Sequence, residues 1–179
     1  ISLKKDSDFL NISERKISES FNRKKLLNQF HNAYFKSLYF DEINELLKEI
    51  ILFEENNLFN YVFNSIKCVC KYLDIETSIK VSSELPLNHN LNGFNRVIDI
   101  CKFLNSKQYI NPIGGLEIYN RDDFKKNDIE LFFLKPKIYE YSQNCKIFTP
   151  WMSIIDVLMY NSKNKTKEFL LPNYDLIRN

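Results

Sequence analysis

The chain has 179 residues, a length that suits one domain, and 44% of them are hydrophobic, with fifteen Phe and ten Tyr available for a core. This apolar content and a formal net charge of only +2 exclude an intrinsically disordered chain and make nucleic acid a poor candidate partner. No apolar run reaches the roughly 18 to 20 residues of a membrane-spanning helix, and the first ten residues lack a signal-peptide pattern. We therefore expect a cytoplasmic protein without a membrane span.

The first half of the chain is predicted to be helical after an extended opening. Apolar residues recur at helical spacing in three consecutive segments, 22–40, 41–53 and 57–75. Asp41 is a suitable N-cap for the second segment. The apolar stripes predict core faces of a helical block.

The second half alternates between strand and helix patterns. Strands are predicted over residues 76–84, 107–112 and 129–139, with a short helix over 94–105. A last helix is expected to start near Thr149-Pro150, since Thr is a good N-cap and Pro is favoured at the first helical position. The fold class that follows is α/β, with an N-terminal helical block packed on a small mixed sheet, in a single domain spanning 1–179.

Two of the three glycines in the chain are adjacent, Gly114 and Gly115, directly after a predicted strand. Glycine accepts positive φ and lets backbone amides approach a ligand closely, so the pair forms either a tight turn or a nest of N–H groups for an anion. The turn is favoured because no Lys-Ser/Thr step of a phosphate loop follows.

Two serine motifs also admit two interpretations. Ser82 and Ser83 end the predicted strand 76–84, where they either bind a polar ligand at the sheet edge or begin a loop. Ser153 and Asp156 lie three residues apart, so a helix places them on one face. We interpret them as helix capping in preference to a nucleophile beside a carboxylate.

Histidine and cysteine give few candidates for catalysis or metal binding. Neither His31 nor His89 belongs to a recognisable triad, and Cys145, beside Lys146, is a candidate thiol nucleophile. Of the four cysteines, Cys68 and Cys70 lie two residues apart on a predicted helix, a spacing that suits neither a disulfide nor a zinc knuckle, and two histidines leave a metal site short of ligands. We expect no metal and no cofactor.

Several of these motifs occur together in an order that resembles the WbqC-like protein family. The shared features are a serine pair, an Arg that opens a helix, a Gly-Gly turn between tyrosines, and a closing segment with Tyr-x-Gln, an aromatic-x-Pro step and Ser-Ile-Ile-Asp. The matching residues are Ser82, Ser83, Arg96, Tyr109, Gly114, Gly115, Tyr119, Tyr141, Gln143, Phe148, Pro150, Ser153, Asp156 and Asn161. The chain departs from the family pattern at Ser162, where a Gly is common, and in the strand and Asn-Arg-Asn step expected before Ile1. The chain is thus expected to be a WbqC-like domain without its N-terminal segment.

The resemblance implies a role in bacterial O-antigen or capsule polysaccharide biosynthesis. We expect a transferase that moves a group from an acyl or similar donor onto a nucleotide- or lipid-linked sugar. The alternative is a non-catalytic protein that binds a carbohydrate intermediate or a partner enzyme. In the first case the catalytic residues are Asp156, as a general base, with Gln143 and Arg96. The expected substrate-binding residues are Ser82, Ser83, Tyr109, Gly114, Gly115, Tyr119, Ser153 and Asn161.

Overall fold

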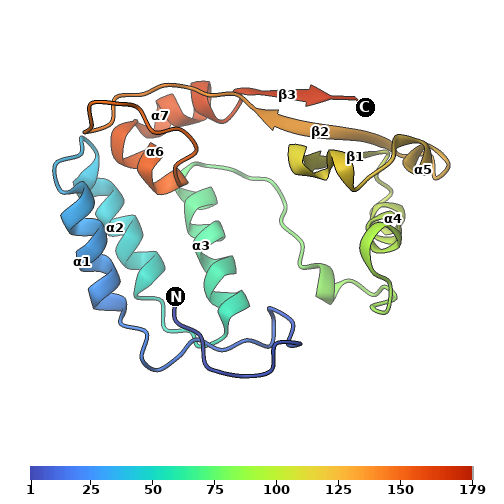
Figure 1. Cartoon of the computed structure of the whole chain (residues 1–179), viewed down its shortest axis with the longest axis horizontal. Coiled ribbons are helices and arrows are strands. Elements are labelled where there is room, and N and C mark those ends of the chain that lie inside the picture. The colour runs from blue at the N-terminus through green and yellow to red at the C-terminus, as the bar shows by residue number, and fades with distance from the viewer. Residues whose placement is uncertain (179) are drawn as a thin grey trace. The chain divides into compact units, whose positions relative to one another are not determined.

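The computed structural model describes residues 1–178, and the chain divides into two compact units. The helical unit combines Ile1–Glu76 with Glu140–Leu170, and the sheet unit combines Thr77–Tyr139 with the segment from Leu171 onward. Figure 1 labels the elements of both units. Each unit has its own hydrophobic core.

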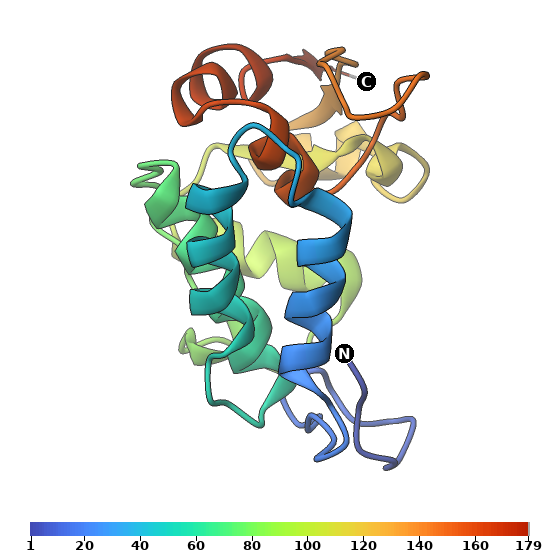
Figure 2. The ribbon, with the colours of Figure 1, turned by 90° about the vertical axis from the view of Figure 1, so that its left-hand side faces the viewer.

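The helical unit is built mainly from three consecutive helices. These are α1 (Arg23–Tyr34), α2 (Phe40–Ile51) and α3 (Leu58–Tyr72), joined by α6 (Ile154–Tyr160) and the short α7 (Lys163–Lys165). Helix α2 contacts α1, α3 and α6, and Figure 2 shows it beside α1. Ile43 and Leu47 of α2 share a core with Leu158 of α6. The three amphipathic helices predicted from the first half are confirmed.

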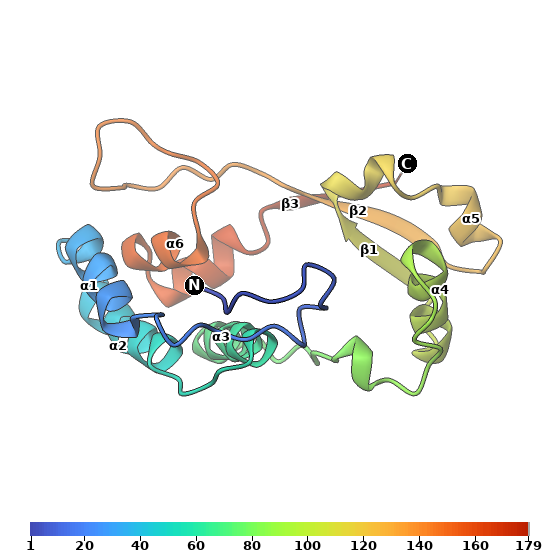
Figure 3. The same ribbon diagram turned by 60° about the horizontal axis from the view of Figure 1, so that its bottom comes forward.

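The residues before α1 form no helix (Figure 3), and part of this segment contacts the N-terminal end of α3. Two isolated bridges, Leu3 with Ile17 and Lys16 with Asn57, hold this segment in place. Asn57 is also the N-cap of α3, because its side chain accepts a hydrogen bond from the backbone N–H of Asn60. The opening segment is therefore attached to the start of a core helix.

Helix α2 starts earlier than its sequence pattern predicts. Its N-cap is Tyr39, whose backbone N–H donates to the carbonyl of Met159 at 3.2 Å. This contact with α6 fixes the start of the helix, so the prediction of Asp41 as N-cap is wrong. Asp41 lies in the first turn, where its charge still favours the helix dipole.

The sheet unit contains a small mixed sheet of three strands. They are β1 (Gln108–Pro112), β2 (Glu130–Pro136) and β3 (Tyr174–Ile177), in the spatial order β1-β2-β3. β1 is parallel to β2, and β3 is antiparallel to it (Figure 1). A parallel pair needs a crossover, and the chain makes it through the 3₁₀-helix Ile113–Glu117 and α5 (Arg121–Lys125).

The core of the sheet unit lies between the sheet and its helices. Phe124 of α5 and Phe133 of β2 are fully buried. They pack with Ile98 and Cys101 of α4 (Gly93–Phe103). The strands predicted at 107–112 and 129–139 are confirmed with shorter bounds.

The strand predicted at 76–84 is wrong. Residues 76–81 form no regular element, and Ser82–Glu84 form a short 3₁₀-helix. The alternation of Thr77 and Ile79 in the sequence does not correspond to a buried face, since both side chains are exposed. The third strand of the sheet is instead β3, near the end of the chain.

The predicted start of the last helix is also wrong. Helix α6 begins at Ile154 with Ser153 as its N-cap, because Trp151 has φ 62° and so interrupts a right-handed helix starting at Pro150. The α/β class, with an N-terminal helical block and a small mixed sheet, is confirmed. One domain over 1–179 stays a prediction.

Candidate functional site

Asp156 is a buried carboxylate in the first turn of α6, with 4% of its surface exposed. The Tyr34 hydroxyl donates to its Oδ1 at 3.0 Å, and the Tyr141 hydroxyl donates to its Oδ2 at 2.7 Å. Gln143 Nε2 donates to the same Oδ2 at 2.8 Å. A buried carboxylate is costly unless it is hydrogen-bonded, and these three donors supply that compensation.

The two tyrosines beside Asp156 hold their protons more tightly than a free phenol does. Burial, then the hydrogen bond to Asp156 and its negative charge, raises the pKa of Tyr34 to about 12. Burial and the hydrogen bond to Asp156 also raise the pKa of Tyr141. Both side chains are therefore hydrogen-bond donors at neutral pH and poorly suited to act as general acids.

Gln143 connects this carboxylate to the loop that precedes α6. Its Oε1 accepts from the backbone N–H of Thr149 at 2.8 Å, and its Nε2 donates to the carbonyl of Thr149 at 3.1 Å. The amide thus closes residues 143–149 into a loop while it also binds Asp156. With these bonds made, Gln143 has little capacity left to bind a ligand.

A pocket of about 210 Å³ adjoins this cluster within the helical unit. It is lined by Lys36, Leu38, Ser142, Gln143, Asn144 and Tyr160. Two of its residues connect it to the carboxylate: Gln143 binds Asp156, and the Tyr160 ring lies edge-on to the Tyr34 ring at 6.1 Å. The pocket wall is consequently held in place by the hydrogen bonds around Asp156.

Ser153 and Asn161, also predicted as binding residues, have structural contacts in α6. Ser153 Oγ accepts from the N–H of Ile155 at 3.3 Å, which confirms the capping interpretation for the serine. Asp156 does not complete a capping box, because its carboxylate bonds to the tyrosines and Gln143. Asn161 is 1% exposed, and its Nδ2 donates to the carbonyl of Val157 at 2.9 Å.

Cys145 is exposed and its sulfur faces two acceptors. Its Sγ lies 3.0 Å from the carbonyl oxygen of Ile147 and 3.6 Å from Gln143 Oε1. The Cys145 thiol is thus a hydrogen-bond donor within the loop 143–149, and its role as a nucleophile stays a prediction.

In the sheet unit, Arg96 holds the loop that contains the serine pair. Its guanidinium donates to the carbonyls of Ser82 at 2.8 Å and Asn88 at 2.9 Å, and it lies 3.1 Å from His89 Nδ1. Ser82 and Ser83 are both exposed. Arg96 therefore binds the backbone of this loop through two carbonyls.

The glycine pair lies within the 3₁₀-helix Ile113–Glu117, and only one of the two glycines is sterically required. A Cβ on Gly115 would come too close to Oδ1 of Asn111 and lie 2.9 Å from its Cγ, whereas one on Gly114 would meet open space. Neither glycine has positive φ. The pair thus lacks the left-handed residue of one kind of anion nest, and the choice between a turn and a ligand loop stays a prediction.

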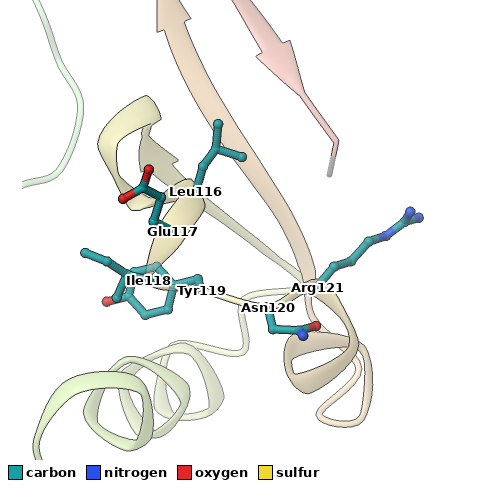
Figure 4. Close-up of a pocket in the computed structure, with 6 residues that line it drawn as sticks. All are labelled: Leu116, Glu117, Ile118, Tyr119, Asn120 and Arg121. Atoms are coloured by element: carbon teal, nitrogen blue, oxygen red, sulfur yellow. The ribbon is translucent and has the colours of Figure 1, made fainter.

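Tyr109 and Tyr119 pack on the core next to this turn. The Tyr109 ring stacks on Phe124 at 5.3 Å, and Tyr119 meets both rings edge-on. Tyr119 also lines a pocket of about 370 Å³ with the other residues of 116–121, drawn in Figure 4. One face of Tyr109 is thus unavailable for stacking on a sugar.

The predicted site residues fall into two sets, one in each unit. Asp156 and Gln143 are brought into direct contact, with Ser153 and Asn161 in the same helical unit. The sheet unit carries the remaining seven, which are Arg96, Ser82, Ser83, Tyr109, Gly114, Gly115 and Tyr119.

The site residues predicted from the sequence did not include the pocket residue Lys36 or the two tyrosines that bind Asp156, although Tyr141 belongs to the Tyr-x-Gln step of the resemblance. Tyr141 lies two residues before Gln143, a spacing that places both side chains on one side of an extended segment. The spacing of Tyr34 does not connect it with Asp156, because 122 residues separate the two.

The fold and site define an α/β protein in which a tyrosine-bound carboxylate supports a polar pocket. The chain belongs to the WbqC-like protein family, whose model matches residues 1–168. Comparisons with curated proteins and with solved structures found no significant match. Within residues 1–178, none of the helices has both the length and the apolar character needed to cross a bilayer.

Proposed function

We propose that the protein acts in the cytoplasm in the assembly of a bacterial surface polysaccharide, by binding a saccharide intermediate in the pocket beside Asp156. Membership of the WbqC-like family supports the pathway. The binding role is supported by one observation: a polar pocket whose wall residue Gln143 is held by hydrogen bonds to Asp156 and Thr149.

The ligand contacts come from the pocket residues that the network leaves available. The side chains of Ser142 and Asn144 make no hydrogen bond to another residue of 1–178, and hydroxyl and amide groups both donate to and accept from sugar hydroxyls. Lys36 adds a cation for a phosphate or carboxylate on the same ligand. Gln143 is a positioning residue in this scheme.

Binding is favoured over group transfer by the surroundings of Asp156. A general base needs a free oxygen within reach of the proton it takes. Both oxygens of Asp156 accept hydrogen bonds, and the side chain is 4% exposed. Transfer of an acyl or similar group onto the sugar would need these bonds to open first.

The test measures binding of a panel of nucleotide sugars and oligosaccharides by titration calorimetry. Ser142→Ala and Asn144→Ala should each weaken binding roughly fivefold, the effect of one lost hydrogen bond. Asn164→Ala, an exposed Asn of the same unit outside the pocket, should bind like the wild type. Absence of saccharide binding, or binding insensitive to both pocket changes, contradicts the proposal. Turnover of a nucleotide sugar with an acyl donor that Asp156→Asn abolishes would establish transfer instead.

A further inference from the structure

A second small pocket, in the sheet unit, has a surplus of positive charge that the proposed function does not use. Its volume is about 130 Å³, and it is lined by Arg121, Lys125, Ile129, Glu130, Leu131 and Arg178. Three cationic side chains thus face one carboxylate. At about 30 Å³ for each water molecule, the pocket holds a small group rather than a whole sugar nucleotide.

The three cations come from two places in the fold. Arg121 and Lys125 lie four residues apart on α5 and therefore on one face of it. Arg178 follows β3, and its guanidinium lies 3.5 Å from Oε1 of Glu130 at the start of β2. The same guanidinium lies over the Phe132 ring at 4.8 Å, which fixes its orientation.

The single carboxylate of the pocket, that of Glu130, already has two partners. Besides Arg178, Glu130 accepts a hydrogen bond from Gln108 Nε2 at 3.3 Å. Arg121 and Lys125 have no ion pair within residues 1–178. Two cations facing one pocket without a counter-charge attract an anionic group, and phosphate oxygens match the guanidinium donors well.

We propose that this pocket, here called the cationic pocket, binds a phosphoryl group of a phosphorylated ligand. A phosphate monoester carries about −1.5 to −2 charges at pH 7, which balances the surplus of two positive charges. A diphosphate of a nucleotide- or lipid-linked sugar has the same chemistry. The inference is independent of the saccharide pocket, which lies in the other unit.

A larger pocket shares one lining residue with the cationic pocket. Arg121 lines both, and in Figure 4 its side chain points away from the other five residues of the larger pocket. That pocket of about 370 Å³ offers the Tyr119 ring and the Asn120 amide.

The first experiment titrates the whole protein with inorganic pyrophosphate, followed by calorimetry at low salt. Arg121→Ala and Lys125→Ala should each weaken binding roughly tenfold or more, as expected for a lost hydrogen bond to a charged group. Lys126→Ala is the matched control, because this neighbouring lysine pairs with Asp123 at 2.8 Å and does not line the pocket. Circular dichroism melting checks that all three variants fold.

No binding of pyrophosphate would overturn the proposal. So would a Lys126→Ala variant that loses as much affinity as Lys125→Ala, since the effect would then be general surface charge. The saccharide titration of the other unit is a separate measurement, so either proposal can fail alone.

A second arm identifies the source of the phosphate. The same variants are titrated with uridine diphosphate and with phosphatidylcholine vesicles that carry an isoprenyl diphosphate. Uridine diphosphate that binds more tightly than pyrophosphate, and requires Lys125, supports a nucleotide ligand. Vesicle binding that requires Lys125 supports a lipid-linked one. Vesicle binding unaffected by Lys125→Ala contradicts recognition of the lipid diphosphate by this pocket.

Discussion

The Tyr34 hydroxyl, at the end of α1, donates a 3.0 Å hydrogen bond to Asp156, 122 residues later in the first turn of α6. This bond joins two helices that are distant in sequence, and Tyr141 and Gln143 complete the set of donors. The same carboxylate therefore contributes to the stability of the helical unit and to the position of the pocket wall.

The first prediction concerns the stability that these bonds provide. Tyr34→Phe and Tyr141→Phe should each lower the free energy of unfolding by about 1 to 2 kcal/mol, because each leaves the buried carboxylate with one donor fewer. Asp156→Ala should cost more, about 3 kcal/mol, since three donors lose their acceptor. Urea denaturation measures these values.

Tyr174→Phe serves as the control, because Tyr174 is 40% exposed in the sheet unit and its hydroxyl makes no hydrogen bond within residues 1–178. Its free energy of unfolding should match the wild type within about 0.5 kcal/mol. Equal stability of Tyr34→Phe and the wild type would show that the hydrogen bond to Asp156 contributes nothing.

The second prediction is a loss of stability at alkaline pH. The folded-state pKa of Tyr34 is raised to about 12, above the ordinary value of 10.0. The native state therefore holds the phenol proton more tightly than the unfolded state. This contribution is complete below about pH 10 and is lost as the pH rises towards about 12.

Tyr141 shifts in the same direction, so a Tyr34→Phe/Tyr141→Phe double variant should lose less stability than the wild type between pH 9 and pH 11. Urea titrations across that interval measure how steeply the free energy of unfolding falls with pH in the wild type and in the double variant. Identical slopes would mean that folding raises the pKa of neither phenol. Other tyrosines whose pKa is raised, such as the half-buried Tyr72, contribute the same pH dependence of stability in both proteins.

The third prediction separates the two adjacent glycines. Gly115→Ala should destabilise the fold by about 1 to 3 kcal/mol, because its Cβ would displace the Asn111 side chain and disturb the bond from Asn111 Nδ2 to the Tyr109 hydroxyl at 2.7 Å. Gly114→Ala meets no atom within 4 Å and should be neutral or stabilising by up to about 1 kcal/mol. Thermal denaturation of the pair of variants is sufficient, and equal melting temperatures would contradict the steric argument.

The helices could be predicted from the sequence because their signal is local and repeated. The stripe of α2 recurs along the whole helix and corresponds to five buried residues. The alternation at 76–84 extends over few residues and has no buried face, so the same reasoning predicted a strand where none exists. Short patterns carry too little information to distinguish burial from chance.

The errors at the site come from interactions between distant residues. Thr149-Pro150 has the local chemistry of a helix start, but Gln143 binds both backbone groups of Thr149 and the helix begins at Ile154. Asp156 was predicted as a site residue, whereas its donor Tyr34 lies on a helix whose pattern indicates only a core face. No spacing rule connects residues that meet only after folding.

The last prediction is that Gln143 restrains the loop before α6. Gln143→Ala removes two hydrogen bonds to the backbone of Thr149 and one to Asp156, so local opening of residues 143–149 should become easier. Trypsin should then cut after the exposed Lys146 roughly tenfold faster or more, which mass spectrometry of the fragments detects.

The fluorescence of Trp151 provides a second measurement of mobility in this region, since Trp151 is the chain's single tryptophan and is 65% exposed. Its fluorescence anisotropy should fall in Gln143→Ala and remain unchanged in Ser142→Ala, a neighbouring change that removes no hydrogen bond of the loop. Cleavage and anisotropy that match the wild type in Gln143→Ala would mean that the loop is held by other contacts. The pocket wall would then be independent of Asp156, and the argument that the carboxylate positions it would fail.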